Sequence, residues 1–369
     1  MKILVTGADG FLGWHLRCRL HALTDHEVLA VGRANFRNLP DLVTGTDAVI
    51  HLAGVNRATD TELVDGNVGL AVAVAEAVRD SGAKPRVIFA NSIHAGDGTP
   101  YGDGKAGAFD VLIAAAAEIG AVCVDVRLPN LFGEHGRPGY NSFVATFCHE
   151  IAQGRTPDVV DNVVPLLHAQ DAAQALMDAL DGPSRVDSPS GEPHCVVDVL
   201  ELIASFAETY TSGEIPVLDD DFAVDLFNTY RASAFLSRGP IEFERKTDSR
   251  GSLVEAIKVR GGGGQAFFST TAPGVTRGEH FHLRKIERFV VMSGRATISL
   301  RRLFGSEVST FEVTGDRPVA IDMPTMWAHN ITNTGPEELL TLFWTNTVFD
   351  PERPDTFAES VDARVEEHA

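Results

Sequence analysis

The hydrophobic pattern of the sequence changes once, near Arg238–Pro240, and this change constrains the fold more than any other feature. Before it, short apolar runs alternate with segments of helical periodicity such as Phe11–Leu23, Val68–Arg79 and Lys105–Ile119. This alternation is typical of a parallel sheet with helices on both faces. We therefore expect residues 1–240 to form a Rossmann-like, doubly wound α/β domain. Its expected strands are Lys2–Thr6, Glu27–Val31, Ala48–Leu52, Arg86–Ala90 and Val122–Leu128.

After the change of pattern the chain contains short strand-like segments, separated by turns with Gly, Pro, Asn or Asp. Seven short strands within about 100 residues are typical of an all-β sandwich or barrel. We therefore expect a second, all-β domain over residues 241–369, and a length of 369 residues suits two domains. The acidic segment after Asp350 is expected to pack as an extended arm or to be partly loose. The expected strands are Leu253–Val259, Gln265–Thr270, Arg288–Met292, Ala296–Arg301, Ser309–Val313, Pro318–Met323 and Leu339–Trp344.

The charge balance excludes some classes of partner. Lys and Arg number 31 against 51 Asp and Glu, so the formal net charge is −20. A chain this acidic is a poor binder of nucleic acid or of an anionic membrane, and no apolar run reaches the roughly 20 residues of a membrane span. The four cysteines form no CxxC pair and the N-terminus lacks a signal-peptide pattern, which favours a cytoplasmic protein with reduced thiols.

A glycine-rich turn, Thr6–Gly13, follows the first expected strand and opens the first expected helix. In dinucleotide-binding folds the first glycine permits a tight turn, the second lets the backbone approach a pyrophosphate, and the third lets the helix pack on the strand. The start of the helix supplies N–H donors for the phosphates. We expect this turn to bind NAD(P), the alternative being a purely structural turn. The residues expected to contact the cofactor are Gly7, Gly10, Phe11, Leu12 and Gly13.

The end of the second expected strand bears on the choice of cofactor. Arg33 lies 20 residues after Gly13, where a site specific for NAD carries an acidic residue. A guanidinium group at this position suits the 2′-phosphate of NADP, and Arg37 could supply a second contact. We therefore expect NADPH as the cofactor, the alternative being that Arg33 is a solvated surface charge.

Tyr101 and Lys105 are four residues apart, so on a helix their side chains face the same way. A nearby ammonium group lowers the pKa of a phenol and makes it a usable proton donor near neutral pH. Ser92 follows the expected strand Arg86–Ala90, where its hydroxyl can hydrogen-bond a substrate carbonyl. The spacing of Tyr and Lys is common by chance, but its place after a dinucleotide-binding turn favours catalysis. We expect Ser92, Tyr101 and Lys105 to be catalytic, with Lys105 also binding the nicotinamide ribose.

In this order, these motifs resemble the extended short-chain dehydrogenase/reductase family across roughly residues 1–240. The resemblance also includes Asn67 and the segment His51–Gly54. It implies that three further residues contact the cofactor: Leu52, Ala53 and Gly54. The segment Arg127–Gly133 resembles the element of that family whose asparagine contacts a nucleotide-sugar substrate, which implies this role for Asn130. Two readings stay open for three neighbouring residues, which either line the same pocket or cap loops: Arg127, Tyr140 and Asn141.

The second domain contains a pattern of metal-ligand residues. His280 and His282 alternate on one expected strand, so both rings point to the same face, and Glu287 begins the next strand. His329 follows 42 residues after Glu287. Three imidazoles and one carboxylate suit a divalent transition ion such as Zn²⁺. We expect these four residues to bind one divalent metal ion.

The spacing of these residues is similar to the two sequence motifs of the cupin superfamily, whose fold is a jelly roll. One departure is Met326, where the second motif usually has Gly. The pattern Asp248-Ser-Arg-Gly-Ser-Leu also resembles the first strand of cupin-type deoxysugar 3,5-epimerases. Some sugar epimerases of this superfamily hold no metal and use a histidine as base, and this is the alternative for the present site.

Nearly end to end, the chain resembles the family of bifunctional UDP-2-acetamido-2,6-dideoxy-β-L-talose synthases of capsular polysaccharide synthesis. The family implies that the cupin domain epimerises C3 of a UDP-linked 4-keto deoxy amino sugar. The reductase domain then transfers hydride from NADPH to C4, with Tyr101 as proton donor and Ser92 orienting the carbonyl. The product would be a precursor of N-acetyl-L-fucosamine in surface polysaccharide.

Several points stay open at the level of sequence. The metal could polarise an enolate oxygen or hold the barrel together, and the base at C3 is not identified. The cupin domain could also be only a binding or dimerisation module, which would leave a single-function 4-reductase, and a further alternative is a non-enzymatic sensor linked to NADPH. Because exposed edges of β-sheets tend to pair with a second copy, we expect a homodimer.

Overall fold

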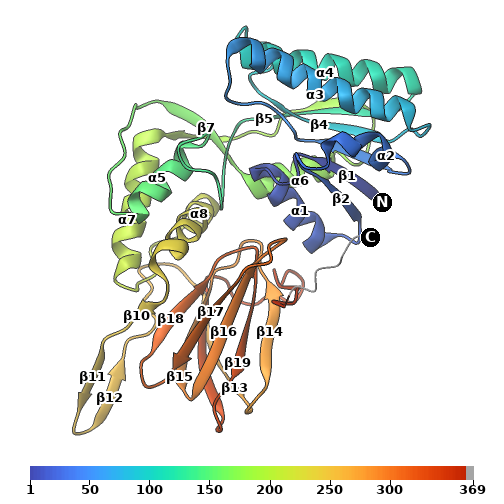
Figure 1. The fold of residues 1–369 in the computed structure, drawn as a ribbon. Coiled ribbons are helices and arrows are strands. Elements are labelled where there is room, and N and C mark those ends of the chain that lie inside the picture. Colours follow the sequence, from blue (N-terminus) through green and yellow to red (C-terminus); the bar gives the residue numbers. More distant parts are fainter. Residues whose placement is uncertain (363–369) are drawn as a thin grey trace. The chain divides into compact units, whose positions relative to one another are not determined.

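The structure is a computed structural model that describes residues 1–362. Its chain divides into two compact units, and each unit contains segments from several parts of the sequence (Figure 1). The first unit comprises Met1–Phe132, Gly139–Ser142 and Asp161–Val196. The second comprises Gly133–Pro138, Phe143–Val160 and the chain from Val197 onward. The expected division into one domain of residues 1–240 and another of residues 241–369 stays a prediction.

The first unit contains a six-stranded parallel sheet in the order β2-β1-β3-β4-β5-β8. After β1 the chain forms β2 on one side and then crosses to form β3 on the other side, so β1 and β3 flank a point where the strand order reverses. In sheets of this kind, ligands bind in the crevice at the carboxyl ends of the strands beside such a point. The strands are β1 (Lys2–Thr6), β2 (Glu27–Val31), β3 (Ala48–His51), β4 (Arg86–Ser92), β5 (Cys123–Leu128) and β8 (Arg185–Asp187).

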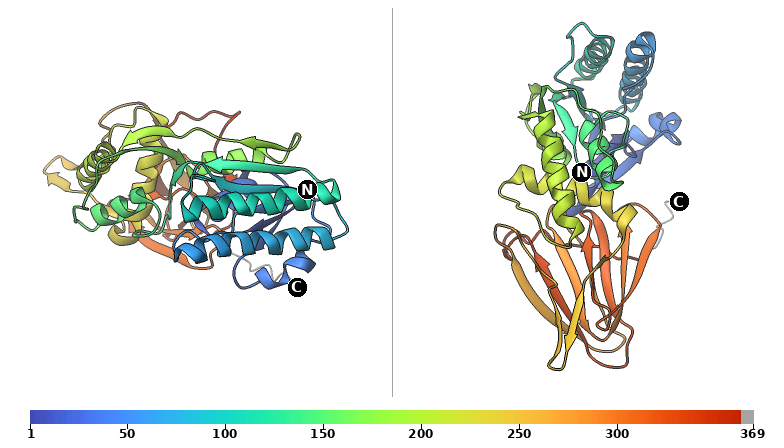
Figure 2. Two further views of the ribbon diagram at one scale, coloured as in Figure 1. Left: turned by 90° about the horizontal axis from the view of Figure 1, so that it is seen from above. Right: turned by 90° about the vertical axis from the view of Figure 1, so that its left-hand side faces the viewer.

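Helices cover both faces of this sheet (Figures 1 and 2). On one face, α1 (Phe11–Leu23) and α6 (Ala169–Asp178) bury a core that includes Leu16 and Leu176. On the other face, α3 (Asp60–Asp80) and α4 (Pro100–Ile119) bury a core that includes Val74. The short helices η1 (Phe36–Asn38) and α2 (Leu39–Val43) precede β3, and a separate small sheet contains β6 (Asn130–Phe132), β7 (Val163–His168) and β9 (Glu192–Cys195). The expected Rossmann-like fold class is confirmed.

Two helices start earlier in the sequence than the hydrophobic pattern predicts, because polar residues cap them. Thr59 caps α3, and Glu62 hydrogen-bonds back to it, so this helix starts at Asp60 rather than at Val68. Thr99 caps α4 in the same way, so that helix starts at Pro100. Tyr101 therefore lies in the first turn of a helix.

The second unit contains two antiparallel sheets of five strands, with a shared core between them that includes Phe289, Leu300 and Trp327 (Figure 1). This confirms the expected all-β fold class of the C-terminal part. One sheet contains β10 (Ile241–Glu242), β18 (Val319–Met323), β15 (Glu287–Ser293), β20 (Leu339–Thr345) and β13 (Gln265–Thr271). The other contains β17 (Val308–Thr314), β16 (Arg295–Arg302), β19 (Trp327–Asn333), β14 (Thr276–Phe281) and β21 (Phe357–Ala358).

Helices α5 (Phe143–Ala152), α7 (Val196–Thr211) and α8 (Asp221–Arg238) precede these strands. A hairpin of β11 (Arg245–Asp248) and β12 (Gly251–Val254) follows them. The expected strand Leu253–Val259 is therefore wrong over most of its length. None of the helices in the described part of the chain is long and apolar enough to cross a membrane.

The segment after Asp350 packs as an extended arm, one of its two expected states. Its strand β21 pairs with β14. Val361 is fully buried, and its backbone carbonyl accepts a hydrogen bond from Arg301 at 2.9 Å. Ion pairing between Arg301 and Glu359 fastens the arm a second time.

Candidate active sites

The glycine-rich turn joins β1 to α1 and leaves no room for a side chain at Gly7 or Gly13. A Cβ atom on Gly7 would lie 2.7 Å from the backbone nitrogen of Ala53, and one on Gly13 would lie 2.2 Å from the carbonyl oxygen of Gly7. Gly7 also has a φ of 68°, which favours glycine. Gly10 is the N-cap of α1 and no side chain caps that end of the helix. The N–H groups of Phe11 and Leu12 are thus left for an anionic group, which fits a dinucleotide phosphate.

The close approach of Gly7 brings a second segment to this turn. Leu52 and Ala53 follow β3 directly, and the backbone nitrogens of both hydrogen-bond the hydroxyl of Thr6. Gly54 leaves space for Asn67, whose side-chain oxygen would lie 3.0 Å from a Cβ atom there. The structure therefore brings Leu52, Ala53 and Gly54 beside the expected phosphate site.

The end of β2 contains charges of both signs. Arg33 is exposed there, as expected for a residue that meets a 2′-phosphate. The carboxylate of Asp9 also lies over this strand end, because its Oδ2 would be 1.9 Å from a Cβ atom on Gly32. Arg17 lies 3.6 Å from the other oxygen of Asp9. An acidic group thus occupies the region where an NAD site holds its carboxylate, although it comes from the glycine-rich turn.

The three expected catalytic residues converge at the carboxyl end of β4. Ser92 is the last residue of β4, and its hydroxyl hydrogen-bonds the phenol of Tyr101. Gly102 allows this approach, because a Cβ atom there would lie 2.2 Å from the carbonyl oxygen of His94. Lys105 is buried one turn further along α4, and its ammonium donates to the carbonyl of Ala90 at 2.6 Å.

Burial dominates the electrostatics of this group. It raises the pKa of Tyr101, an effect that the hydrogen bond with Ser92 partly offsets. Burial also lowers the pKa of Lys105 from 10.5 to about 7, against the opposing effect of Asp125. The expected lowering of the Tyr101 pKa by Lys105 is therefore wrong for this arrangement, because the ammonium points to the carbonyl of Ala90.

The four expected substrate residues are spread over β5, β6 and the following loop. Arg127 donates to the buried carboxylate of Asp125 at 2.8 Å, which holds its guanidinium at the strand end. Asn130 begins β6 and is exposed, as is Asn141. Tyr140 packs under the guanidinium of Arg57, with 5.4 Å between that group and the ring centroid. Their roles as ligands of a substrate stay predictions.

Two buried groups, Asp125 and His51, lie beside this site, and sequence reasoning missed Asp125. Asp125 lies two residues before Arg127 and so on the same face of β5, and one of its oxygens is buried without a hydrogen-bond partner. His51 stacks on Phe89, and burial lowers its pKa to about 3. An acidic residue inside an otherwise apolar strand is the signal that could have identified Asp125.

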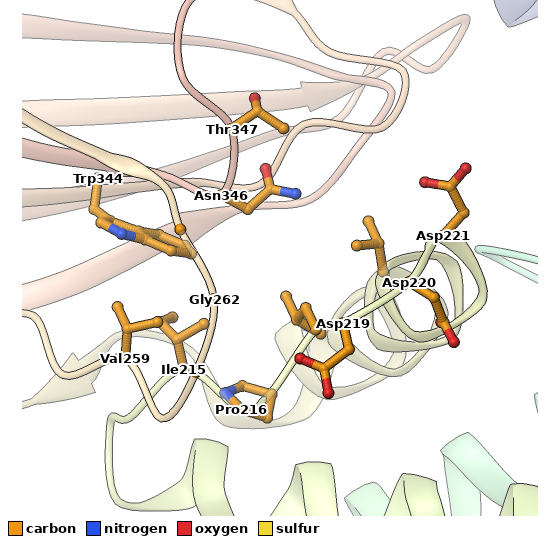
Figure 3. Close-up of a pocket in the computed structure, with 14 residues that line it drawn as sticks. Ile215, Pro216, Asp219, Asp220, Asp221, Val259, Gly262, Trp344, Asn346 and Thr347 are labelled. Atoms are coloured by element: carbon orange, nitrogen blue, oxygen red, sulfur yellow. The ribbon is translucent and has the colours of Figure 1, made fainter.

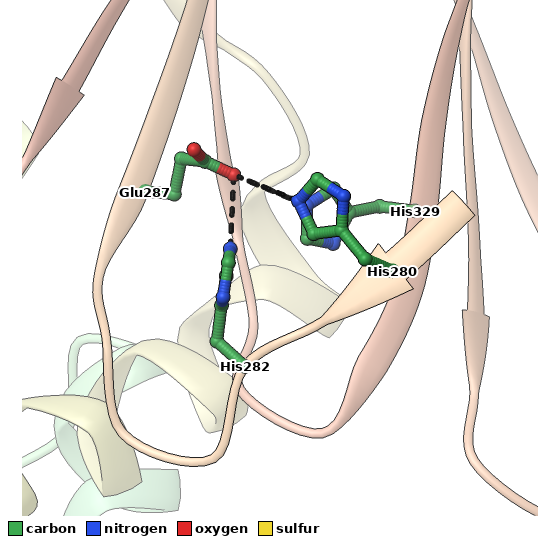
Figure 4. A group of neighbouring side chains, drawn as sticks. All are labelled: His280, His282, Glu287 and His329. Carbon is green, nitrogen blue, oxygen red and sulfur yellow. Dashed lines mark hydrogen bonds and ion pairs between the residues drawn. The ribbon is translucent and has the colours of Figure 1, made fainter. Parts of the chain in front are cut away.

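In the second unit, the expected metal ligands form one cluster (Figure 4). One ligand atom from each of the four residues lies within 4.8 Å of the others. The Oε2 atom of Glu287 lies 3.1 Å from Nε2 of His282, 3.1 Å from Nε2 of His329 and 3.8 Å from Nε2 of His280. The sheet register pairs His280 with His329 and sets Glu287 at the start of β15.

Carbonyl groups orient two of these imidazoles. The Nδ1 atom of His282 donates to the carbonyl of Asp355 at 2.5 Å, and that of His329 donates to the carbonyl of Trp327 at 3.1 Å. With the proton on Nδ1, the Nε2 lone pair of each ring points to the cluster, which is the usual arrangement of metal-ligating histidines. The donor set therefore fits a divalent transition ion.

The protonation states agree with this fit. Burial alone would raise the pKa of Glu287, but the side chains of His280, His282 and His329 that face it hold that pKa well below its usual value. Burial lowers the pKa of His329 to about 4. An ionised carboxylate and a neutral imidazole are the forms that bind a metal ion.

Two features around the cluster bear on the sequence analysis. Met326, which replaces the expected Gly, has a φ of 59° and is fully buried, so the turn keeps a left-handed residue at this position. Asp355 was not predicted as part of the site. Its carboxylate accepts backbone hydrogen bonds from Leu283, Arg284 and Lys285. Because it lies in the C-terminal arm, no local sequence signal connects it to His282.

A separate cavity of about 220 Å³ lies elsewhere in the second unit (Figure 3). Asp219, Asp220 and Asp221 line one side of it, and Trp344 and Asn346 line another. It shares no residue with the metal cluster.

Comparisons with known proteins cover both units. A model described as the NAD dependent epimerase/dehydratase family matches residues 3–192, and one described as the polysaccharide biosynthesis C-terminal domain matches residues 246–357. A relative from Pseudomonas aeruginosa, UDP-2-acetamido-2,6-beta-L-arabino-hexul-4-ose reductase, is 35% identical over 372 residues. The match covers 98% of this chain and 99% of that protein.

Solved structures show the same arrangement of folds along the chain. The capsular polysaccharide assembling protein CapF from Staphylococcus aureus matches with a TM-score of 0.64 and 32% identity, over 98% of this chain and 100% of that chain. RMD from Pseudomonas aeruginosa, solved with NADPH, matches with a TM-score of 0.50 and 22% identity, over 56% of this chain and 85% of that chain. The second likeness shows the fold alone.

Proposed function

This chain belongs to the NAD dependent epimerase/dehydratase family, and we propose that it reduces the 4-keto group of a UDP-linked deoxy amino sugar with NADPH. The observation that carries the proposal is the convergence of Ser92, Tyr101 and Lys105 in the same unit as a glycine-rich turn that is crowded at Gly7 and Gly13. The similarity to a UDP-sugar reductase over nearly the whole chain supports the substrate class. Arg33 supports NADPH over NADH, with Asp9 as an opposing charge.

The residues of the chain divide the work of this reduction. NADPH supplies a hydride to C4 when it is bound. The phenol of Tyr101 donates its proton to the oxygen at C4, while the hydroxyl of Ser92 hydrogen-bonds that oxygen and holds it in line. Lys105 holds the nicotinamide ribose, and the hydrogen bond from Ser92 stabilises the phenolate that remains. Asn130, with Arg127, Tyr140 and Asn141, binds the UDP-sugar.

We further propose that the all-β unit is a cupin and that it epimerises C3 of the same substrate before the reduction. The metal cluster supports this second activity, since a divalent ion such as Zn²⁺ would supply Lewis-acid stabilisation of charge next to an acidified C–H bond. The 4-keto group acidifies the proton at C3, and a base of the site removes it and a proton returns on the other face. The product is then UDP-2-acetamido-2,6-dideoxy-L-talose, a capsule precursor, made in the cytoplasm by a homodimer.

The proposed epimerisation is tested apart from the reduction. We expect the chain, incubated with the 4-keto sugar in D₂O without NADPH, to incorporate deuterium at C3, as observed by NMR of the sugar. The His329→Ala variant is expected to lose the metal and this exchange together. A wild-type chain that shows no exchange but oxidises NADPH would be a single-function reductase with a binding or dimerisation unit.

The proposed reduction is tested with Tyr101→Phe, which removes the proton donor and keeps the ring. We expect the rate of NADPH oxidation with the 4-keto sugar to fall by about 10²- to 10⁴-fold. NMR of the product formed with NADPH would identify its configuration at C3 and C4. A Tyr101→Phe variant that oxidises NADPH at the wild-type rate would contradict the assignment of the proton donor.

A further inference from the structure

A cavity of about 430 Å³ in the second unit lies outside both candidate sites. It is lined by the loop that follows β6, by one side each of α5 and α8, and by Arg302 at the end of β16. Its volume is within the roughly 300–1,000 Å³ of small-ligand sites. It shares no residue with the metal cluster or with the group around Tyr101.

The side chains that line this cavity are unusual for a chain with a net charge of −20. Arg137 and Arg302 contribute two guanidinium groups, and His135 and His149 contribute two imidazoles. Among the described residues that line the cavity, none is Asp or Glu. The charged side chains that line the cavity are therefore basic, whereas the whole chain is acidic.

Hydrogen bonds determine which nitrogens of the two imidazoles carry protons. The indole of Trp327 donates to Nε2 of His135 at 3.0 Å. The side-chain amide nitrogen of Gln153 lies 3.0 Å from Nε2 of His149 and is itself a donor. Both rings therefore accept at Nε2 and carry the proton on Nδ1 in their neutral form. The residues that line the cavity thus include Arg and His side chains with N–H groups, together with the hydroxyl of Ser233.

The loop that presents Arg137 is held in place. Glu134 is fully buried and accepts a hydrogen bond from the hydroxyl of Thr325 at 2.5 Å, and His135 is fixed by Trp327. A loop fastened at two consecutive residues keeps its donors in position before a ligand arrives, which lowers the entropic cost of binding.

We propose that this cavity binds a phosphate-bearing small molecule. Two guanidinium groups with several neutral donors match an anion that has many acceptor oxygens, and Arg binds phosphate oxygens in pairs. The smaller cavity differs in charge, because Asp219, Asp220 and Asp221 line it. The inference does not depend on the proposed sugar chemistry, since no residue of the cavity takes part in it.

The test is a calorimetric titration of the full-length protein, saturated with NADPH, with inorganic pyrophosphate. We expect one binding component that Arg137→Gln and Arg302→Gln each weaken by about tenfold or more. Arg137 is exposed, so its substitution leaves the core intact. The matched control is Arg353→Gln, a change of another exposed arginine, which is expected to keep the component unchanged.

Further arms separate this site from the proposed reductase site and identify the ligand. Arg127→Gln is expected to keep the component, because Arg127 does not line the cavity. If the cavity binds UDP more tightly than pyrophosphate, its ligand is a nucleotide. If the two affinities are equal, its ligand is a free phosphate. Absence of the component, equal affinity in Arg137→Gln and Arg353→Gln, or tighter binding of citrate than of pyrophosphate would overturn the proposal.

Discussion

At the residue scale, Asp9 is the side chain that most affects the expected choice of cofactor. Its carboxylate lies over Gly32 at the end of β2, beside the exposed Arg33. The glycine-rich motif could be predicted from the sequence, but the position of this carboxylate could not. It depends on how far β2 extends beside the turn, which is a property of the folded sheet.

We predict that Asp9→Asn raises kcat/KM for NADPH relative to NADH by roughly twofold to fivefold. The physical reason is that it removes a negative charge near the 2′-phosphate at an exposed site, where such interactions amount to about 0.2–1 kcal/mol. Steady-state kinetics with both cofactors measures the ratio. Asp25→Asn, a change of another exposed aspartate, is the matched control and is expected to leave the ratio unchanged. An unchanged ratio in Asp9→Asn would contradict the placement of Asp9 beside the ribose.

Lys105 carries a prediction about pH. Its pKa is lowered from 10.5 to about 7 in the folded chain, so the unfolded chain binds more protons between these values. Stability conferred through this group therefore rises with pH across that window, by at most about 1.4 kcal/mol per pH unit. We expect the free energy of unfolding of the cofactor-free wild type to rise relative to Lys105→Met between about pH 7 and pH 9, as measured by urea denaturation. A constant difference would show that burial does not lower the pKa of Lys105.

At the scale of elements, the hydrophobic pattern predicted where strands begin better than where helices begin. β1, β2 and β4 begin as expected because short apolar runs mark them, whereas α3 and α4 begin at polar caps that the hydrophobic pattern omits. The cluster of three histidines and Glu287 could be predicted because the spacing of its members along the sequence matches strands that meet in the second unit. Asp355 could not, because it reaches His282 from 73 residues away along the chain.

The C-terminal arm is therefore the element on which we base a prediction about the metal. Asp355→Ala removes the carboxylate that accepts three backbone hydrogen bonds. It also places Ala at a φ of 42°, a conformation that Asp tolerates better. We expect the arm to loosen, the carbonyl that orients His282 to move, and metal affinity to fall by about 10- to 100-fold.

Competition with a chromogenic chelator measures this change in metal affinity. The matched control is Asp350→Ala in the preceding turn. The carboxylate of Asp350 accepts hydrogen bonds from Glu352 and Arg353, both of which are exposed. We expect it to leave the metal affinity unchanged. Equal affinities for the wild type and Asp355→Ala would show that the arm does not position His282.

At the scale of the whole molecule, the charge balance carries a prediction. A net charge of −20 favours unfolding through self-repulsion, and salt screens this repulsion. We expect Tm at pH 8 to rise by a few degrees between about 20 mM and about 300 mM NaCl, as measured by circular dichroism. At pH 5, close to the sequence pI of about 5.0, the same change in salt should have little effect. An equal response at both pH values would show that net charge is not the cause.

The contact between the arm and His282 also has a consequence for the order of events in time. Its two partners close a loop of 73 residues, and contacts so distant along a chain form late in folding. Until that loop closes, one imidazole of the cluster lacks the acceptor that aims it. We therefore expect a newly made chain to take up its ion only after β14 and the arm have paired, so that loading with metal reports the completion of folding.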